Sequence, residues 1–237
     1  MTLYDEPIDR LLALVPADSR RFAYQPTTLP MDSSPTVLLG CDTAYELGGS
    51  QTPCVSTLAV SSGRPFDNSV TLIGPDLTEI RRDCSFGKVV LLQIEDVQEQ
   101  AAFDCIKELE RLRYSFAPTG LMTRASAYNM REQIRVSKAA VKSGLSFADY
   151  GRALLGAYLQ RPEVRSGQVL IFTDRPSLDT LAALAETIRS TTDALNHILD
   201  DVLLDCKSCN LKPICDQVEG MRELHFSRQK AKRGKKE

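Results

Sequence analysis

The sequence predicts an α+β fold: a mixed sheet packed by helices, with a C-terminal metal-binding cysteine loop after a long helical segment. Three observations lead to this prediction. Short apolar segments bounded by glycine and proline, typical of buried strands, fill much of the first half of the chain. Segments with helical spacing of apolar residues dominate the second half. Three of the seven cysteines lie close together near the C-terminus.

Length and composition are those of a globular protein. The chain has 237 residues, 43% of them hydrophobic, enough for one large or two small domains with an apolar core. No apolar run is long enough to span a membrane, and acidic residues stand near the N-terminus where a signal peptide would carry basic ones. We therefore expect a cytoplasmic protein with no membrane partner. An odd number of cysteines without an export signal argues against a disulfide framework.

Residues 1–35 are predicted to be an N-terminal extension and linker. A short amphipathic helix places Ile8, Leu11, Leu12 and Leu14 on one face. The stretch QPTTLPMDSSP that follows has the composition of a linker.

A central domain over residues 36–204 begins with a β-rich half. A strand is expected within TVLLGCDTAYEL, before the glycine turn at Gly48 and Gly49. Three further strands are predicted at 55–62, 70–73 and 88–94. Asp96 can cap a helix that extends to about Tyr114.

Beyond residue 120 the pattern is predicted to be helical. Ser137 starts a short helix that Gly144 stops. Ser146 and Asp149 resemble a capping box for the next helix, which Pro162 ends.

The last part of the central domain is predicted to contain one strand and one long helical segment. The strand covers residues 169–172, and the helical segment runs from about 177 to 204. A break is expected near residues 190–192, where hydroxyl side chains could start a second helix. This segment leads directly to the cysteines.

The cysteine motif, residues 205–226, is the main candidate for a metal site. Cys206, Cys209 and Cys215 form a C-x2-C-x5-C pattern, and His225 follows. Thiolates bind iron and zinc, and two cysteines separated by two residues can hold one metal from a single tight turn. With His225 they would supply a Cys3His set for an iron–sulfur cluster or for zinc. His225 is the weaker member, because the fourth position could also be open or filled by another chain.

Other candidates carry less chemistry. The remaining cysteines, Cys41, Cys54, Cys84 and Cys105, are scattered and are interpreted as core or ordinary thiols. Residues 227–237 form a basic tail, expected to be disordered, which lacks the aromatic residues that stack on nucleic acid bases. Nucleic acid is therefore not an expected partner.

Several short motifs, in one order, resemble the central region of CO-methylating acetyl-CoA synthase. That enzyme is the subunit of the CO dehydrogenase/acetyl-CoA synthase system that carries the nickel–iron–sulfur A-cluster. The resemblance extends from about residue 36 to residue 226. The motifs are Tyr45-Glu46-Leu47-Gly48-Gly49, Thr52-Pro53, Ile73-Gly74-Pro75-Asp76, Arg135-Val136-Ser137-Lys138, Tyr150-Gly151 and Ile171-Phe172-Thr173-Asp174.

The resemblance implies an iron–sulfur cluster, most simply [4Fe–4S]. Cys206, Cys209 and Cys215 match the first three cysteines of the family's four-cysteine motif, the third with a shortened spacer, and His225 stands in place of the fourth. The family's nickel pair also needs a Cys-x-Cys site, which this sequence lacks, so nickel is not expected from this chain alone.

The resemblance also bears on ligands and partners. A tryptophan associated with coenzyme A in the family is missing, and Arg124 lies near the matching place. Arg135 and Lys138 are the best candidates for cofactor, anion or partner contacts. The implied partners are a corrinoid iron–sulfur protein or subunits of the CO dehydrogenase/acetyl-CoA synthase complex.

Three functional hypotheses follow from the sequence. The first is an acetyl-CoA-synthase-like iron–sulfur protein of anaerobic one-carbon metabolism, of the Wood–Ljungdahl type, that docks a corrinoid protein or a synthase partner. The second is a binding or regulatory module, stapled by zinc or an iron–sulfur cluster, that uses its basic tail. The third is part of an acyltransferase that a nickel-bearing chain completes. Without a nickel site, acetyl-CoA synthesis by this chain alone is not expected.

Overall fold

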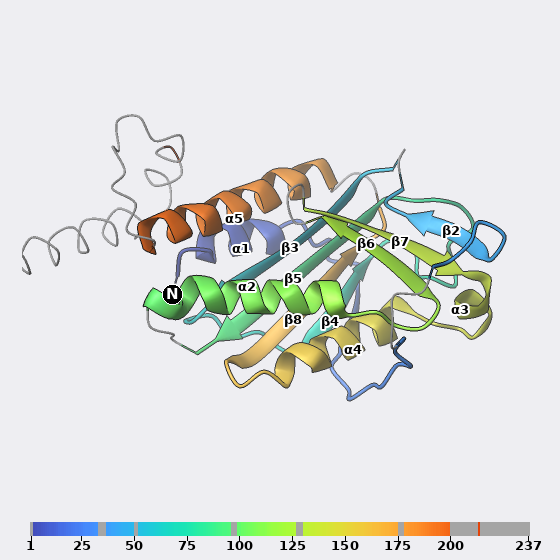
Figure 1. Cartoon of the computed structure of the whole chain (residues 1–237), viewed down its shortest axis with the longest axis horizontal. Coiled ribbons are helices and arrows are strands. Elements are labelled where there is room, and N and C mark those ends of the chain that lie inside the picture. The colour runs from blue at the N-terminus through green and yellow to red at the C-terminus, as the bar shows by residue number, and fades with distance from the viewer. Residues whose placement is uncertain are drawn as a thin grey trace, which may run out of the picture.

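The computed structural model describes residues 2–32, 37–49, 52–95, 99–126, 130–174 and 178–199, together with residue 213. These residues form a mixed α+β fold in which a mixed sheet is packed by helices, as the sequence predicts (Figure 1). The predicted C-terminal cysteine loop lies outside them. The elements are α1 (Asp5–Leu12), β1 (Arg20–Ala23), β2 (Thr43–Leu47), β3 (Cys54–Ser61), β4 (Ser69–Ile73), β5 (Phe86–Ile94), α2 (Glu99–Ser115), β6 (Leu121–Ser126), β7 (Arg131–Ser137), α3 (Lys138–Lys142), α4 (Phe147–Leu159), β8 (Val164–Phe172) and α5 (Leu178–Leu199).

The larger sheet has five strands in the order β1-β4-β8-β5-β3. The pairs β4–β8 and β3–β5 are parallel, whereas β5 pairs antiparallel with β8 and β1 pairs antiparallel with β4. The carboxyl ends of β4 and β8 therefore lie at the same end of the sheet as the amino ends of β3 and β5. This end of the sheet positions the candidate site described below.

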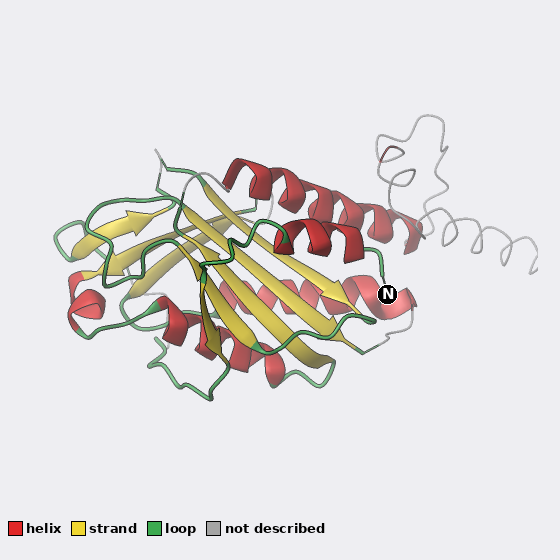
Figure 2. Ribbon diagram, turned by 180° about the vertical axis from the view of Figure 1, so that it is seen from behind, coloured by secondary structure: helices red, strands yellow, loops and turns green. Residues whose placement is uncertain are grey.

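Helices cover both faces of this sheet. A Cβ at Gly167 would lie 2.8 Å from Leu155 of α4, whereas a Cβ at Gly87 would lie 2.7 Å from Leu178 of α5. In the β5–β8 register Gly87 lies opposite Phe172, so these two residues face the same side of the sheet. Phe172 and Gly167 are five positions apart on β8 and face opposite sides, so Gly87 and Gly167 also face opposite sides. Figure 1 shows α2 and α4 in front of the strands, and Figure 2, seen from behind, shows α1 and α5 in front. The domain thus has three layers.

Burial on both faces explains the strands that the sequence reveals. Every residue of β3 and β4 is buried, and so is all of β5 except Gln93. Strands covered on both sides appear in a sequence as short, continuous apolar runs. The predicted strands at 55–62, 70–73 and 88–94 are confirmed.

The smaller sheet corrects one prediction. Residues just beyond 120 are not helical: β6 and β7 form an antiparallel hairpin that β2 extends, in the order β2-β7-β6. The residues of β7 do alternate, with Glu132, Ile134 and Val136 buried and the intervening Gln133 and Arg135 partly exposed. This alternation of buried and partly exposed residues is hard to recognise in the sequence, because the strand contains several charged residues. Pairing with a strand almost ninety residues earlier in the chain stabilises the hairpin.

Helix α5 corrects a second prediction, because it is continuous through residues 190–192. The hydroxyl of Thr191 donates to the carbonyl of Thr187 at 2.9 Å, and that of Thr192 donates to the carbonyl of Ile188 at 3.0 Å. These bonds satisfy the hydroxyls inside the helix, so they do not compete with it for backbone groups.

The local signals for α3 and α4 are confirmed. The Ser137 hydroxyl accepts a hydrogen bond from the amide of Ala140, and the Ser146 hydroxyl accepts one from the amide of Asp149, each at 3.0 Å. Both serines therefore cap a helix N-terminus. Gly144, beyond α3, has φ of +79°, as expected of a glycine that stops a helix.

The N-terminal residues contribute to the same core. Ile8 and Leu11 of α1, on the predicted apolar face, are fully buried. The sequence gives no signal for β1, yet β1 pairs with β4 along its whole length, from Arg20 opposite Leu72 to Ala23 opposite Ser69. Residues 2–23 thus pack on the five-stranded sheet.

Candidate functional site

The predicted metal ligands lie outside the described residues. Cys206, Cys209, Cys215 and His225 all follow Leu199, the last described residue of α5. Among the residues that the structure describes, no group of three or more histidine, cysteine, aspartate or glutamate side chains could hold a metal ion. The metal site therefore remains a prediction from the sequence.

Four of the six motifs that carry the resemblance meet at one end of the five-stranded sheet, which we call the motif edge. Gly48 and Pro53 precede β3, Gly74 follows β4, and Thr173 follows β8. Backbone hydrogen bonds join these segments. The amide of Phe86 donates to the carbonyl of Pro53 at 3.0 Å, and the amide of Thr173 donates to the carbonyl of Ile73 at 2.8 Å. Residues up to one hundred positions apart in the sequence are thus joined at this end of the sheet.

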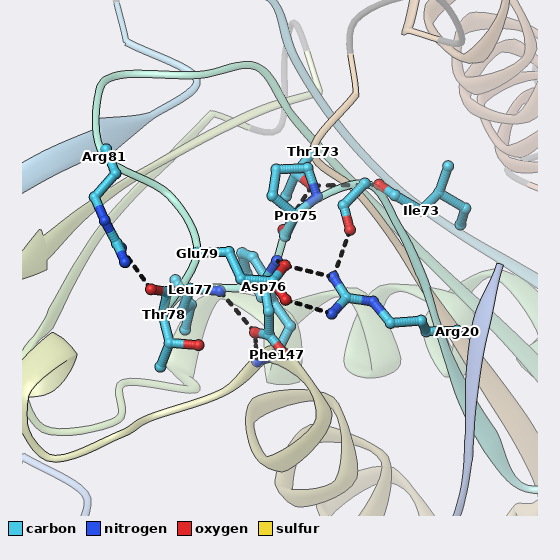
Figure 3. Close-up of polar contacts among 11 residues, drawn as sticks. Arg20, Ile73, Pro75, Asp76, Leu77, Thr78, Glu79, Arg81, Phe147 and Thr173 are labelled. Carbon is cyan, nitrogen blue, oxygen red and sulfur yellow. Dashed lines mark hydrogen bonds and ion pairs between the residues drawn. The ribbon is translucent and has the colours of Figure 1, made fainter.

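The Gly74 turn at the motif edge requires glycine (Figure 3). Gly74 has φ of +102°, and a Cβ there would lie 2.5 Å from Thr173 Oγ1. The Thr173 hydroxyl donates to the carbonyl of Pro75 at 2.8 Å. Glycine is needed both for its backbone conformation and for this close approach.

Asp76 connects this turn to helix α4. Its Oδ1 accepts hydrogen bonds from the amides of Leu77 at 2.6 Å and Phe147 at 2.7 Å. Phe147 is the first residue of α4, so the carboxylate lies at the positive end of the helix. Asp76 is buried, and these two hydrogen bonds from the backbone indicate a role in positioning the turn.

Arg20 closes the same turn from the N-terminal strand. Its guanidinium binds both carboxylate oxygens of Glu79 at 2.8 Å and donates to the carbonyl of Gly74 at 2.7 Å (Figure 3). The Arg20 hydrogen bond lowers the pKa of Glu79 below its ordinary value of 4.5. Sequence reasoning missed Arg20, because its strand carries no recognisable signal.

Arg135 and Lys138, the predicted contact residues, are hydrogen-bonded within their own chain. Arg135 on β7 forms an ion pair with Glu46 on β2, with Nε 2.6 Å from Oε1. Lys138 begins α3, is exposed, and donates to the carbonyl of Cys41 at 2.7 Å. Lys138 is thus the more accessible of the two cations. Arg124, on β6, is also exposed.

A buried polar cluster lies between the two sheets and helices α2 and α4. Lys88 of β5 pairs with Glu132 of β7, and both side chains are at most 1% exposed. Lys88 also donates to the hydroxyl of Tyr150 at 3.1 Å, and Glu132 accepts from the hydroxyl of Ser56 at 2.8 Å. Arg113 of α2 donates to the same Ser56 oxygen at 3.3 Å. This cluster was not predicted, since a lysine within an apolar strand resembles a surface residue in the sequence.

Burial controls the chemistry of this cluster. Desolvation lowers the pKa of Lys88, and the adjacent Glu132 carboxylate opposes that shift. Desolvation likewise raises the pKa of the Tyr150 phenol well above its ordinary value. Ser56 and Arg113 line a cavity of about 310 Å³, whereas Lys88 and Glu132 are sealed behind them. We interpret the ion pair as a structural link between the sheets.

The four scattered cysteines are not arranged for metal binding or nucleophilic chemistry. Cys41 is exposed and Cys54 is buried, where its sulfur accepts a hydrogen bond from Arg131 Nε at 3.3 Å. Burial raises the pKa of the Cys84 thiol to about 11 and also raises that of Cys105. Cys84 is therefore protonated at neutral pH, as expected of an ordinary thiol.

Within the described part of the chain, no helix is long and apolar enough to cross a membrane.

The motif edge lies within a region of the chain that is similar to known proteins. The family described as CO dehydrogenase/acetyl-CoA synthase complex beta subunit matches residues 39–178, which include every strand except β1 and all of α2, α3 and α4. The carbon monoxide dehydrogenase/acetyl-CoA synthase subunit alpha of Moorella thermoacetica is 28% identical over 174 residues. That alignment covers 72% of this chain but only 24% of the relative, so the chain spans about a quarter of its length. The match covers more than half of the chain and all of the motif edge, and the chain therefore belongs to the CO dehydrogenase/acetyl-CoA synthase complex beta subunit family.

Proposed function

We propose that this chain is an acetyl-CoA-synthase-like iron–sulfur protein of one-carbon metabolism that works with other subunits of a CO dehydrogenase/acetyl-CoA synthase complex. The observation that carries the proposal is the family match over residues 39–178, which contain both sheets apart from β1. The named relative is itself a subunit of such a system, which supports complex subunits as partners.

The donor set near the C-terminus fits an iron–sulfur cluster. Cys206, Cys209 and Cys215 supply three thiolates, and His225 is the proposed fourth ligand. A bound cluster would supply a structural cross-link or a one-electron carrier. The same residues also suit zinc, which is the alternative cofactor. We favour the cluster because the chain belongs to a family of synthase subunits.

The helix that leads to these cysteines is firmly attached to the domain. Leu178 and Leu181 of α5 pack beside Gly87 of β5, and the hydroxyls of Thr192 and Tyr4 are hydrogen-bonded at 2.9 Å. The helix that precedes the cysteine motif in the sequence is thus part of the same core as the sheet.

Full acetyl-CoA synthesis is not part of the proposal for the isolated chain. Joining a methyl group and CO requires a metal that can bind both, and nickel serves this purpose in the family. The 237 residues contain no Cys-x-Cys pair to hold nickel. We therefore expect the chain to depend on a partner for the reaction, and propose a corrinoid protein or a synthase subunit as the molecule that it docks.

Metal analysis tests the cluster. Protein prepared without oxygen is expected to be brown, with broad absorbance at about 400 nm and both iron and acid-labile sulfide bound. C209S is expected to remove most of this absorbance, whereas C41S, at an exposed cysteine outside the motif, leaves it unchanged. H225A tests the fourth ligand, since an unchanged EPR spectrum and iron content would remove His225 from the ligand set. Colourless protein with one bound zinc would refute the iron–sulfur assignment and favour the regulatory module instead.

Partner retention tests the docking role separately. The chain is expected to be retained on an immobilised corrinoid iron–sulfur protein, and K138E is expected to weaken that retention, because Lys138 is the exposed cation of the motif residues. K142E is the matched control, with the same charge reversal at an exposed site on the same short helix. Equal loss for both variants would show a general charge effect and contradict a role for Lys138.

A further inference from the structure

A cavity of about 530 Å³ lies on the α1 side of the five-stranded sheet. The chain leaves α1, crosses the face of the sheet as a loop, and returns as β1 at its far edge (Figure 2). The cavity lies beneath this crossing loop and beside the loop between β3 and β4. Its volume is in the range of sites that bind small molecules in other proteins. The lining comes from the end of α1 and the loop after it, from the loop between β3 and β4, and from strands β1, β4 and β8.

The floor of this cavity is polar, which is unusual for the covered face of a sheet. Thr71 of β4 and Gln168 of β8 are 3% and 7% exposed, and both contribute to the lining. Within the described residues, the Gln168 side chain makes one long hydrogen bond, 3.4 Å from Nε2 to Thr71 Oγ1. Ser19 Oγ, in the roof, is buried with no hydrogen-bond partner there. A buried polar atom without a partner is destabilising, so a polar ligand group placed beside it would be stabilised.

Two arginines stand at the rim. Arg21 is paired with Asp67, and Arg64 with Asp9, which does not line the cavity. The lining therefore carries two positive charges and one negative. A guanidinium has five N–H donors, so each arginine can bind an anionic group while keeping its ion pair.

The walls between floor and rim are apolar. Leu12, Val15, Pro65 and Phe66 form most of this part of the lining. From floor to rim, the cavity thus presents hydrogen-bonding groups, then apolar side chains, and then guanidinium groups.

We propose that this cavity binds a small organic carboxylate whose apolar body carries an amide or hydroxyl group. The carboxylate meets Arg21 and Arg64, the apolar body packs against Phe66, and the polar group reaches Gln168 and Thr71. The roof comes from residues 12–19, which precede the family match at residues 39–178. None of the lining residues belongs to the segments of the motif edge, so the site is separate from that edge and does not rest on the proposed iron–sulfur function.

N-acetyl-L-leucine is a suitable probe, because it joins a carboxylate, a branched apolar side chain and an amide. Titration of the full, isotope-labelled chain, followed by NMR, is expected to shift the backbone amide of Phe66 and the side-chain amide of Gln168. N-acetyl-L-leucinamide, which differs only in lacking the carboxylate, is expected to bind about tenfold more weakly, the usual scale of one lost charge-assisted hydrogen bond.

Four variants complete the test. R64Q is expected to weaken binding of the acid about tenfold and to leave binding of the amide unchanged. Q168M is expected to weaken both ligands, while T71V serves as a second floor variant if Q168M does not fold. R111Q is the matched control, because Arg111 is an exposed arginine of α2 that is paired with Glu108 and does not line the cavity.

Each outcome of these titrations either supports or refutes the proposed site. Stronger binding of the acid than of the amide, lost in R64Q and kept in R111Q, supports the site. Equal binding of the two ligands would refute recognition of a carboxylate. Absence of shifts at tens of millimolar ligand, or shifts located elsewhere on the domain, would refute the cavity as a binding site.

Discussion

At the scale of single residues, buried polar side chains link the two sheets of this domain. The pair Lys88–Glu132 joins the five-stranded sheet to the three-stranded sheet, and Tyr150 and Ser56 satisfy further hydrogen-bonding capacity of the two ions. A buried ion pair is costly to desolvate, so its net effect on stability is small while both partners are present. Its effect becomes large when one partner is removed, because an uncompensated charge is left in the core.

Replacing one member of this pair tests that interpretation. E132Q is expected to lower the free energy of unfolding by about 3–5 kcal/mol, because Lys88 loses its counter-ion. The double variant K88M/E132L is expected to recover most of the loss, since neither member of the pair is left as a buried charge without its counter-ion. Urea denaturation followed by circular dichroism measures both values. A double variant less stable than E132Q would show that the pair contributes net stability.

Arg20 and Glu79 give the motif edge a dependence on pH. The lowered pKa of Glu79 means that the folded state favours the carboxylate, so this contribution is present above the ordinary value of 4.5 and is lost as pH falls through the lowered pKa. E79Q is therefore expected to be less stable than the unmodified chain at pH 7, with a difference that shrinks below about pH 4.5. Thermal melts across this range measure the difference. A difference independent of pH would contradict the ion pair.

Close packing of helices on strands depends on a few glycines. In α4, a Cβ at Gly151 would lie 2.5 Å from Val70, which is fully buried in β4. At Gly156, five residues further along the same helix, a Cβ would lie 3.1 Å from the hydroxyl of Tyr24. The first neighbour is a branched core side chain, and the second is the end of a long side chain that can move.

This contrast gives a matched pair of substitutions within one helix. G151A is expected to lower the free energy of unfolding, because overpacking costs about 1–3 kcal/mol and exceeds the gain of up to about 1 kcal/mol from replacing a helical glycine. G156A is expected to be neutral or stabilising by up to about 1 kcal/mol. Chemical denaturation of both variants tests the prediction, and equal effects would show that Val70 does not limit the approach of α4.

The whole molecule is larger than the region that matches its family. The match begins at residue 39, yet α1 and β1 lie before it and complete the structure: Tyr4 contacts Thr192 of α5, and β1 extends the five-stranded sheet. The described N-terminal residues also roof the proposed carboxylate cavity. They therefore take part in the fold and in a candidate site.

If the N-terminal residues fold with the rest, a core substitution in α1 destabilises the whole domain. I8A is expected to lower the free energy of unfolding by about 2–5 kcal/mol, in a single transition, because Ile8 is fully buried. L39A is the control, since Leu39 is 60% exposed and its loss is expected to change stability by no more than about 0.5 kcal/mol. An unchanged midpoint for I8A would show that α1 is not part of the cooperative unit.

Sequence patterns predicted those elements whose signals are local. Strands β3, β4 and β5 appear as apolar runs because they are buried on both faces, and α3 and α4 are marked by capping serines. The hairpin β6–β7 and the strand β1 were missed, because pairing with distant strands stabilises them. The same reason hid Arg20 and the Lys88–Glu132 pair, whose partners lie 59 and 44 residues away.

The sequence by itself determined the family of this protein, the class of its fold and the cysteine pattern from which a metal site is proposed. Those features depend on residue types at short spacing, which a linear reading preserves. Only the tertiary structure decided that four of the separated motifs meet at one end of a mixed sheet, that a lysine is buried beside a glutamate, and that the N-terminal residues cover a polar-floored cavity. Each of these depends on which strands pair and which faces the helices cover, and such long-range contacts form only when the chain is folded.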